Sequence, residues 1–277
     1  MRRINYILVQ ALLVTSIIVL LLPVFWVILV SFYSRDVIRL IFSEILKGNF
    51  HFDSLTLSNY AYILGDPNFL RWLLNSFIVA SGVAFVSTFI GFMAGYGISR
   101  YEFPGKRSFL LSLLITQLFP IAMMIVPFLV IASILGLIGT LHGLSFAYLA
   151  TTLPFSIWIL KGFFDTVPHD MEEAAEVDGA NLLQLIAYVL IPIARPALAT
   201  SFIFSFVTCW NEYAISFVFL SDVTLYTLPP GIKSMLDNND LSGFSAAVVL
   251  VSIPVVILFM YIRKELVESV TLGAVKE

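Results

Sequence analysis

The sequence predicts an all-α polytopic membrane protein, and three observations support this fold class. Of the 277 residues, 60% are apolar and only 12% are charged. The mean hydropathy is +0.98, which is well above the values typical of soluble globular domains. Long apolar runs alternate with short segments that contain charges, glycine or proline. We therefore expect a single membrane domain over residues 1–277.

Six apolar runs are long enough to cross a bilayer, since a helix needs roughly 20 residues to span the hydrocarbon core. They cover residues 7–32, 72–98, 109–134, 144–162, 197–220 and 244–262. The first follows Arg2 and Arg3, as a signal peptide would, but it exceeds the length of a signal core and no small-residue cleavage site follows it. We expect it to remain as the first of six transmembrane helices.

Lysine and arginine are distributed unequally between the two sides of these spans. One side carries Arg2, Arg3, Arg100, Lys106, Arg107, Lys161, Arg195, Arg263, Lys264 and Lys276. The other carries Arg35, Arg39, Lys47, Arg71 and Lys233. Because cytoplasmic loops are enriched in basic residues, this bias predicts that both termini are cytoplasmic. It also places the segment 163–196 in the cytoplasm.

The segment 163–196 is strongly acidic and interrupts the apolar pattern. Its carboxylates are Asp165, Asp170, Glu172, Glu173, Glu176 and Asp178. Pro168 followed by Asp170 as an N-cap is typical of a helix start, and Asp178-Gly179 is typical of a helix end. These signals predict a short acidic helix in water.

A second helix is expected from about Asn181 to Leu190. Leu182, Leu185, Ile186 and Val189 recur at helical spacing and predict one buried face. Pro192 and Pro196 are expected to end this helix before the next span. The segment 163–196 is thus predicted to form a helix-turn-helix beneath the membrane.

No motif for catalysis or metal binding is found. Gly105-Lys106-Arg107-Ser108 lacks the loop length of a phosphate-binding motif, so ATP hydrolysis would need another subunit. Cys209 is the only cysteine, and His51, His142 and His169 lie in three different predicted loops. Ser145 has no histidine on a later span to act as its base. We expect no enzyme activity, no metal site and no cofactor on this chain.

The order Glu173-Ala174-Ala175, Gly179 and Ile191-Pro192 resembles the signature loop of inner-membrane permease subunits of binding-protein-dependent ABC importers. Further matches resemble the carbohydrate-uptake, maltose-transporter-type branch and extend along nearly the whole chain. They include Asn59-Tyr60, Trp72, Asn75-Ser76, Gly95-Tyr96, Arg100, Phe103-Pro104-Gly105, Tyr148, Gly162-Phe163-Phe164 and Trp210-Asn211-Glu212-Tyr213.

This resemblance implies that the segment 163–196 is a coupling loop that contacts a cytoplasmic ATPase subunit, with Glu173 facing a basic residue there. The residues it implies for this contact are Asp170, Met171, Glu172, Glu173, Ala174, Ala175, Asp178 and Gly179. It also implies a second homologous permease, two ATPase subunits that hold ATP and magnesium, and an extracytoplasmic solute-binding protein. The loop 221–243 is similar to the family's outer loop. We expect no nucleic-acid partner, and the resemblance implies a location in the inner membrane of a prokaryote.

Glu212 is the only acidic residue inside a predicted span, where an uncompensated carboxylate costs roughly 2.5–3.5 kcal/mol at the centre of a helix. One interpretation is that Trp210, Asn211, Glu212 and Tyr213 line a path for a sugar. The resemblance implies that this sugar is a di- or oligosaccharide. The other is a structural hydrogen bond to a neighbouring helix, or contact with the outer water. Both remain open from the sequence.

A stand-alone secondary carrier or channel for small polar solutes is the alternative function. It would also need six helices and an intramembrane carboxylate, but not the acidic helix-turn-helix. Carriers commonly show repeated halves or paired broken helices, and the sequence has no convincing internal repeat.

Overall fold

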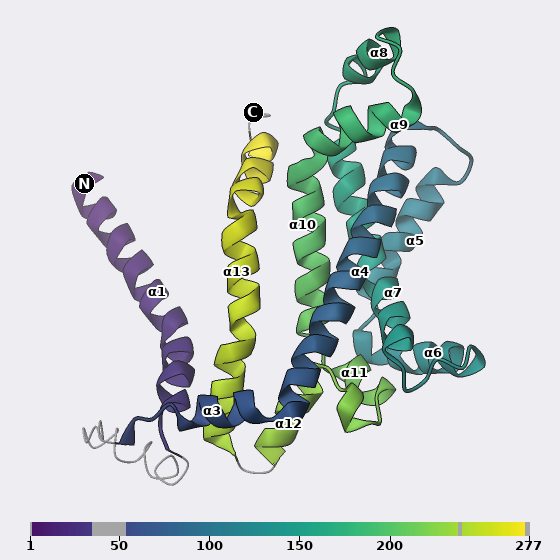
Figure 1. Ribbon diagram of the computed structural model, residues 1–277. Coiled ribbons are helices and arrows are strands. Elements are labelled where there is room, and N and C mark those ends of the chain that lie inside the picture. Colours follow the sequence, from purple (N-terminus) through teal and green to yellow (C-terminus); the bar gives the residue numbers. More distant parts are fainter. Residues whose placement is uncertain (1, 35–53, 238–239, 275–277) are drawn as a thin grey trace. The chain divides into compact units, whose positions relative to one another are not determined.

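The computed structural model describes residues 2–34, 54–237 and 240–274. Within these ranges the regular elements are helices, apart from an isolated β-bridge between Tyr33 and Leu55 (Figure 1). The long helices are α1 (Arg2–Ser31), α4 (Pro67–Arg100), α7 (Leu141–Phe164), α10 (Ile191–Trp210) and α13 (Leu241–Ala274). The shorter ones are α3 (Ser58–Gly65), α5 (Lys106–Leu118), α6 (Ile121–Ile134), α8 (Asp170–Val177), α9 (Leu182–Gln184), the π-helix η2 (Leu185–Leu190), α11 (Ala214–Phe219), the 3-10 helix η3 (Val223–Leu225) and α12 (Leu228–Asp237).

Among the described residues, five helices are long and apolar enough to cross a membrane. A sixth span results if α5 and α6, which are joined by a sharp bend, count as one. The predicted all-α polytopic fold is confirmed, with a span count of five to six.

The prediction of one continuous helix over 109–134 is wrong. The chain bends by 108° between α5 and α6. Pro120 has no N–H for the helix ladder, and it disfavours the helical conformation at the residue before it. Phe119 is accordingly extended, with ψ 129°.

The prediction that Pro192 and Pro196 end the second helix of the segment 163–196 is also wrong. The π-helical turn η2 leads directly into α10, whose second residue is Pro192. Local π-helical adjustments of this kind let a membrane helix accommodate a proline. The helix continues past Pro196 to Trp210, so residues 182–210 form one span. The expected span 197–220 instead stops at Trp210, and α11 begins separately at Ala214.

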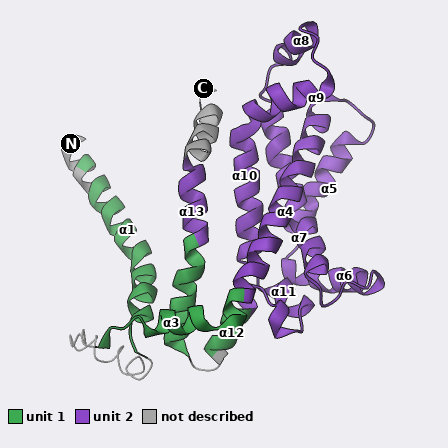
Figure 2. Ribbon diagram, viewed as in Figure 1, with its two compact units in different colours: residues 1–70, 231–253 green, residues 71–230, 254–277 purple. Residues whose placement is uncertain are grey.

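The chain divides into two compact units, each coloured separately in Figure 2. The first consists of residues 1–70 and 231–253. In it, the side-chain amide of Asn59 in α3 donates to the carbonyls of Ser31 (2.9 Å) and Tyr33 (2.8 Å) at the end of α1. The hydroxyls of Ser31 and Tyr60 lie 2.6 Å apart. These contacts attach α3 to α1. The segment between the first two predicted spans lies partly outside the described residues, and its described end contains α3, for which no helix was predicted.

The second unit consists of residues 71–230 and 254–277, and its centre is the packing of α4, α7 and α10. A Cβ atom added at Gly91 would lie 2.9 Å from Ser156 Cβ, and one added at Gly95 would lie 2.7 Å from the Lys161 backbone nitrogen. The glycines therefore allow α4 and α7 to approach as closely as small residues permit in membrane helices.

Hydroxyl groups link the same three helices within the apolar interior of the second unit. Ser156 of α7 contacts Ser87 of α4 at 2.9 Å and Ser205 of α10 at 3.2 Å. Thr88 of α4 contacts Ser201 of α10 at 3.1 Å. All five side chains are buried, so each hydroxyl gains a partner that lipid could not supply.

The first part of the predicted loop 221–243 packs against the beginning of α4. The Trp72 indole nitrogen donates to the Val223 carbonyl at 2.6 Å. The Asn75 side-chain amide donates to the carbonyls of Thr224 (3.1 Å) and Tyr226 (3.0 Å). This part of the loop is therefore held in a defined conformation, while residues 238–239 lie outside the described ranges.

Candidate coupling site

The two faces of α8 differ in exposure. Glu173 and Ala174 are exposed, and Val177 has 87% of its surface accessible. Glu172, one position before Glu173, is only 8% exposed. Ala175 is half-buried and packs against the apolar cluster around Phe164. The exposed members of the predicted coupling set are Asp170, Met171, Glu173, Ala174, Asp178 and Gly179.

The helix α8 begins one residue earlier than an Asp170 N-cap would require. His169 occupies the N-cap position with helical φ −62° and ψ −31°, and no side chain caps this end. The backbone N–H groups of Glu172 and Glu173 donate to the His169 carbonyl. Asp170 is thus the first helical residue, where its charge still interacts favourably with the positive end of the helix dipole.

Glu172 is held by two residues at the end of α4. The Arg100 Nε donates to Glu172 Oε1 at 2.6 Å, and the Tyr96 hydroxyl donates to Glu172 Oε2 at 2.9 Å. The other two guanidinium nitrogens of Arg100 donate to the carbonyls of Phe164 (2.9 Å) and Val167 (3.1 Å). We call these five residues the Arg100 cluster. No local sequence signal indicates this partnership, although Arg100 is among the residues that carry the family resemblance.

A second ion pair lies nearby at the end of α7. Lys161 donates to Asp165 at 2.6 Å, and Ser99 donates to the other carboxylate oxygen at 2.8 Å. Partial burial favours the neutral acid, but the hydrogen bonds from Lys161 and Ser99 outweigh it and hold the pKa of Asp165 below its usual value. Asp165 is therefore ionised near neutral pH.

The turn after α8 follows the predicted chemistry. Gly179 has φ +85°, the left-handed conformation that glycine adopts without steric cost. Asn181 and Gln184 then form a capping box, in which each side chain accepts a hydrogen bond from the other residue's backbone N–H. This capping box was not predicted, although the Asn-x-x-Gln spacing signals it.

The second helix of the segment buries most of its predicted apolar face. Leu185 is 3% exposed, and Ile186 and Val189 pack against the cluster that contains Phe164. Leu182 is 59% exposed, so its assignment to the buried face is wrong. It lies in the first turn, before the helix reaches the bundle.

The candidate pathway residues lie where α10 ends and α11 begins. Trp210 is 1% exposed and stacks on Phe206, whereas Asn211 and Tyr213 are exposed. The Glu212 carboxylate accepts from the N–H groups of Ile215 (2.8 Å) and Ser216 (3.0 Å).

The Tyr148 hydroxyl of α7 also donates to Glu212, at 2.8 Å. Three hydrogen bonds thus compensate this carboxylate, and together they hold the start of α11 against α7. They provide a structural reason for the acid at this position. A part in the solute path stays a prediction.

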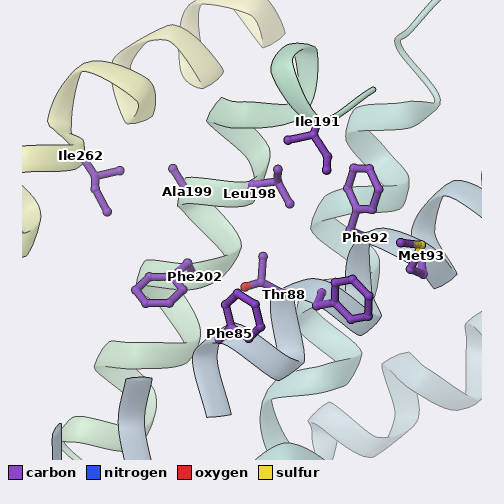
Figure 3. Close-up of a pocket in the computed structure, with 10 residues that line it drawn as sticks. Phe85, Thr88, Phe92, Met93, Ile191, Leu198, Ala199, Phe202 and Ile262 are labelled. Atoms are coloured by element: carbon purple, nitrogen blue, oxygen red, sulfur yellow. The ribbon is translucent and has the colours of Figure 1, made fainter. Parts of the chain in front are cut away.

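An apolar cavity of about 450 Å³ lies in the second unit (Figure 3). It is lined by Phe85, Thr88, Phe89, Phe92, Met93, Ile191, Leu198, Ala199, Phe202 and Ile262. The hydroxyl of Thr88 already contacts Ser201. A sugar needs hydrogen-bonding groups that this cavity does not offer, so the cavity is a poor candidate for the solute path.

The described residues contain no group of three His, Cys, Asp or Glu side chains placed to hold a metal ion. Of the three histidines considered from the sequence, His51 lies outside the described residues.

Comparison with known proteins places these features in a family. A family model described as "Binding-protein-dependent transport system inner membrane component" matches residues 87–271, which include α8 and the Arg100 cluster. The chain belongs to this family. It is therefore the membrane component of an ABC transporter and not its ATPase, as the resemblance implied.

Relatives of this permease extend over most of its length. It is 30% identical over 226 residues to the maltodextrin transport system permease protein MdxG of Bacillus subtilis (strain 168), which covers 80% of this chain and 81% of the relative. It is 32% identical over 264 residues to the trehalose/maltose transport system permease protein MalG of Thermococcus litoralis, covering 94% and 92%.

A solved structure has the same fold as this permease. It is a chain of a bacterial ABC transporter involved in the import of the acidic polysaccharide alginate. The match has a TM-score of 0.76 and 25% sequence identity, and it covers 95% of this permease and 96% of the other chain. The expected membership of the ABC importer permeases is confirmed.

Proposed function

We propose that this permease imports a di- or oligosaccharide together with a second homologous permease, two ATPase subunits and an extracytoplasmic solute-binding protein. In this proposal α8 is the coupling helix that an ATPase subunit contacts. The observation that carries the proposal is the division of α8 into an exposed face with Glu173 and Ala174 and a buried face with Glu172.

The exposed face of α8 has the chemistry of a protein-binding surface. Val177 is 87% exposed, and Leu183 and Tyr188 in the adjoining helix are 76% and 78% exposed. Exposed apolar residues beside carboxylates favour a partner that covers the apolar surface and supplies basic groups. A cytoplasmic ATPase subunit would meet both requirements.

The ATPase subunit would lie on the cytoplasmic side, which is where the lysine and arginine distribution puts α8. Ten basic residues fall on the side of α8 and both termini, against five on the other side, when the six predicted spans are used. The helix α8 and the turn that follows it would then be cytoplasmic, and the loop 221–243 would face the solute-binding protein.

A sugar substrate is supported by the relatives, whose names give maltodextrin and trehalose/maltose as their substrates. Asn211 and Tyr213 are the exposed members of the candidate pathway set, and Tyr213 stacks on Phe217 with centroids 5.4 Å apart. An exposed amide and an aromatic ring are groups that bind sugars through hydrogen bonds and ring faces. We therefore assign solute contact to Asn211 and Tyr213, with Glu212 holding their segment in place.

Charge reversal at Glu173 tests the proposed role of α8. Glu173→Lys should reduce uptake of maltose, trehalose or maltodextrin at least tenfold in cells that carry the whole transporter, because it places a cation against a basic partner. Glu102→Lys is the control, since Glu102 is also an exposed carboxylate, at 88% of its side chain, but lies outside α8. Uptake by Glu173→Lys equal to that of the control, at matched membrane abundance, would contradict the coupling role.

A stand-alone carrier would behave differently in the same cells. Deleting the ATPase subunits should abolish uptake if this permease works as proposed. A carrier would retain it.

A further inference from the structure

The Arg100–Glu172 ion pair is buried, although it lies at the end of α4. The side chains of Arg100 and Glu172 are only 6% and 10% exposed. Buried ion pairs often add little net stability, because removing two charges from water costs about as much as their attraction returns. Stability alone therefore does not explain why this ion pair is present.

The connections of α8 to its neighbours suggest that explanation. The chain itself joins α8 to α7 through residues 165–169 and to α10 through residues 178–190. Neither peptide segment joins α8 to α4. Among the described residues, the hydrogen bonds from Tyr96 and Arg100 to Glu172 supply a polar connection between α4 and α8.

The guanidinium group of Arg100 connects α4 to both α8 and the end of α7. Its Nε binds Glu172 of α8, while its two terminal nitrogens bind the carbonyls of Phe164 and Val167 at the end of α7. A planar guanidinium whose three nitrogens all donate hydrogen bonds has little freedom to rotate. Arg100 thus fixes α8, the end of α7 and the end of α4 to one another.

We infer that Arg100 is a positioning residue for coupling, which fixes α8 to α4 through Glu172 so that a displacement of α8 also moves α4. The inference rests on the proposed role of α8 as the coupling helix. From α4 the displacement passes to α7 at Gly91 and Gly95, where the two backbones are in close contact, and through the Ser87–Ser156–Ser205 hydroxyls to α10. Tyr96 restrains the second oxygen of Glu172 and supports the same connection.

Two variants separate this role from a role in folding. Glu172→Gln keeps the shape of the side chain but removes its charge. The double variant Arg100→Met/Glu172→Met replaces both charges by apolar groups of similar length, a change that leaves stability near neutral in other buried pairs. Asp165→Asn is the matched control, because Lys161–Asp165 has the same 2.6 Å length nearby but an aspartate side chain that is 44% exposed.

The measurement uses the complete transporter in proteoliposomes, with maltose, trehalose and maltodextrin as probes. We expect the double variant to assemble with its partners and hydrolyse ATP, but to transport at least fivefold less sugar per ATP hydrolysed. Glu172→Gln should show a smaller loss, and Asp165→Asn should keep the ratio of the unmodified transporter.

An unchanged ratio in the double variant would overturn the inference. So would transport and ATP hydrolysis that fall together in proportion to the amount of assembled complex, since that result indicates a folding role. Crosslinking of Ala174→Cys to the ATPase subunit separates this inference from the proposed function. If that crosslink forms while the double variant stays coupled, only the role of Arg100 is refuted.

Discussion

Replacing Gly95 by alanine should separate α4 from α7. The added Cβ would lie 2.7 Å from the Lys161 backbone nitrogen and 3.0 Å from the Leu160 carbonyl carbon, whereas ordinary contacts are 3.4–4 Å. Backbone atoms cannot rotate away as a flexible side chain can, so the two helices must shift. Overpacking of this kind costs typically about 1–3 kcal/mol.

Gly97→Ala is the matched control, because it lies on the same helix and no atom comes within 4 Å of its added Cβ. Alanine at that position should be neutral or stabilising, by up to about 1 kcal/mol from helix propensity. The midpoint of thermal unfolding of the detergent-purified transporter should therefore fall for Gly95→Ala and stay or rise for Gly97→Ala. Equal midpoints for the two variants would refute the close packing of α4 on α7.

Two further substitutions test the turn after α8 and the carboxylate beside α11. Gly179→Ala should destabilise the turn by about 1–2 kcal/mol, because Gly179 has φ +85°. Gly179→Asn should cost less, since asparagine tolerates this conformation. Equal losses of thermal stability and uptake in the two variants would show that the left-handed backbone is not the reason for glycine here. Glu212→Gln turns an acceptor into a donor opposite Ile215, Ser216 or Tyr148. It should lower the free energy of unfolding by about 1–3 kcal/mol and therefore lower the thermal midpoint. Altered KM values for maltose, trehalose and maltodextrin at unchanged stability would instead favour direct solute contact.

Hydropathy was sufficient to predict the fold class, because a membrane helix needs about 20 apolar residues whatever its tertiary contacts. It did not predict where α5 and α6 separate or where α10 ends. Pro120 is one of several prolines inside apolar runs, and Pro127, Pro154 and Pro254 lie within helices that continue through them. Sequence alone does not distinguish a proline that bends a span from one that the helix accommodates.

The candidate site, too, could be predicted only in part from the sequence. The order of residues predicted a short acidic helix ended by Gly179, and both features are present. It did not predict that Glu172 is buried while Glu173 is exposed, because that difference depends on how α8 rotates as it packs on the bundle. The partner of Glu172 is 72 residues away at Arg100, and no local periodicity relates the two positions.

Proximity of α8 to an ATPase subunit is the most direct test of the coupling role. Ala174→Cys, in a Cys209→Ser background, should crosslink to the ATPase subunit in native membranes, since Ala174 lies on the exposed face of α8. Tyr101→Cys is the control at another exposed position, with 63% of Tyr101 accessible at the end of α4. We expect a crosslinked product from Ala174→Cys that is much stronger than from Tyr101→Cys and that changes when ATP is added. Absence of any ATPase subunit crosslinked to Ala174→Cys would contradict the role of α8 as the coupling helix.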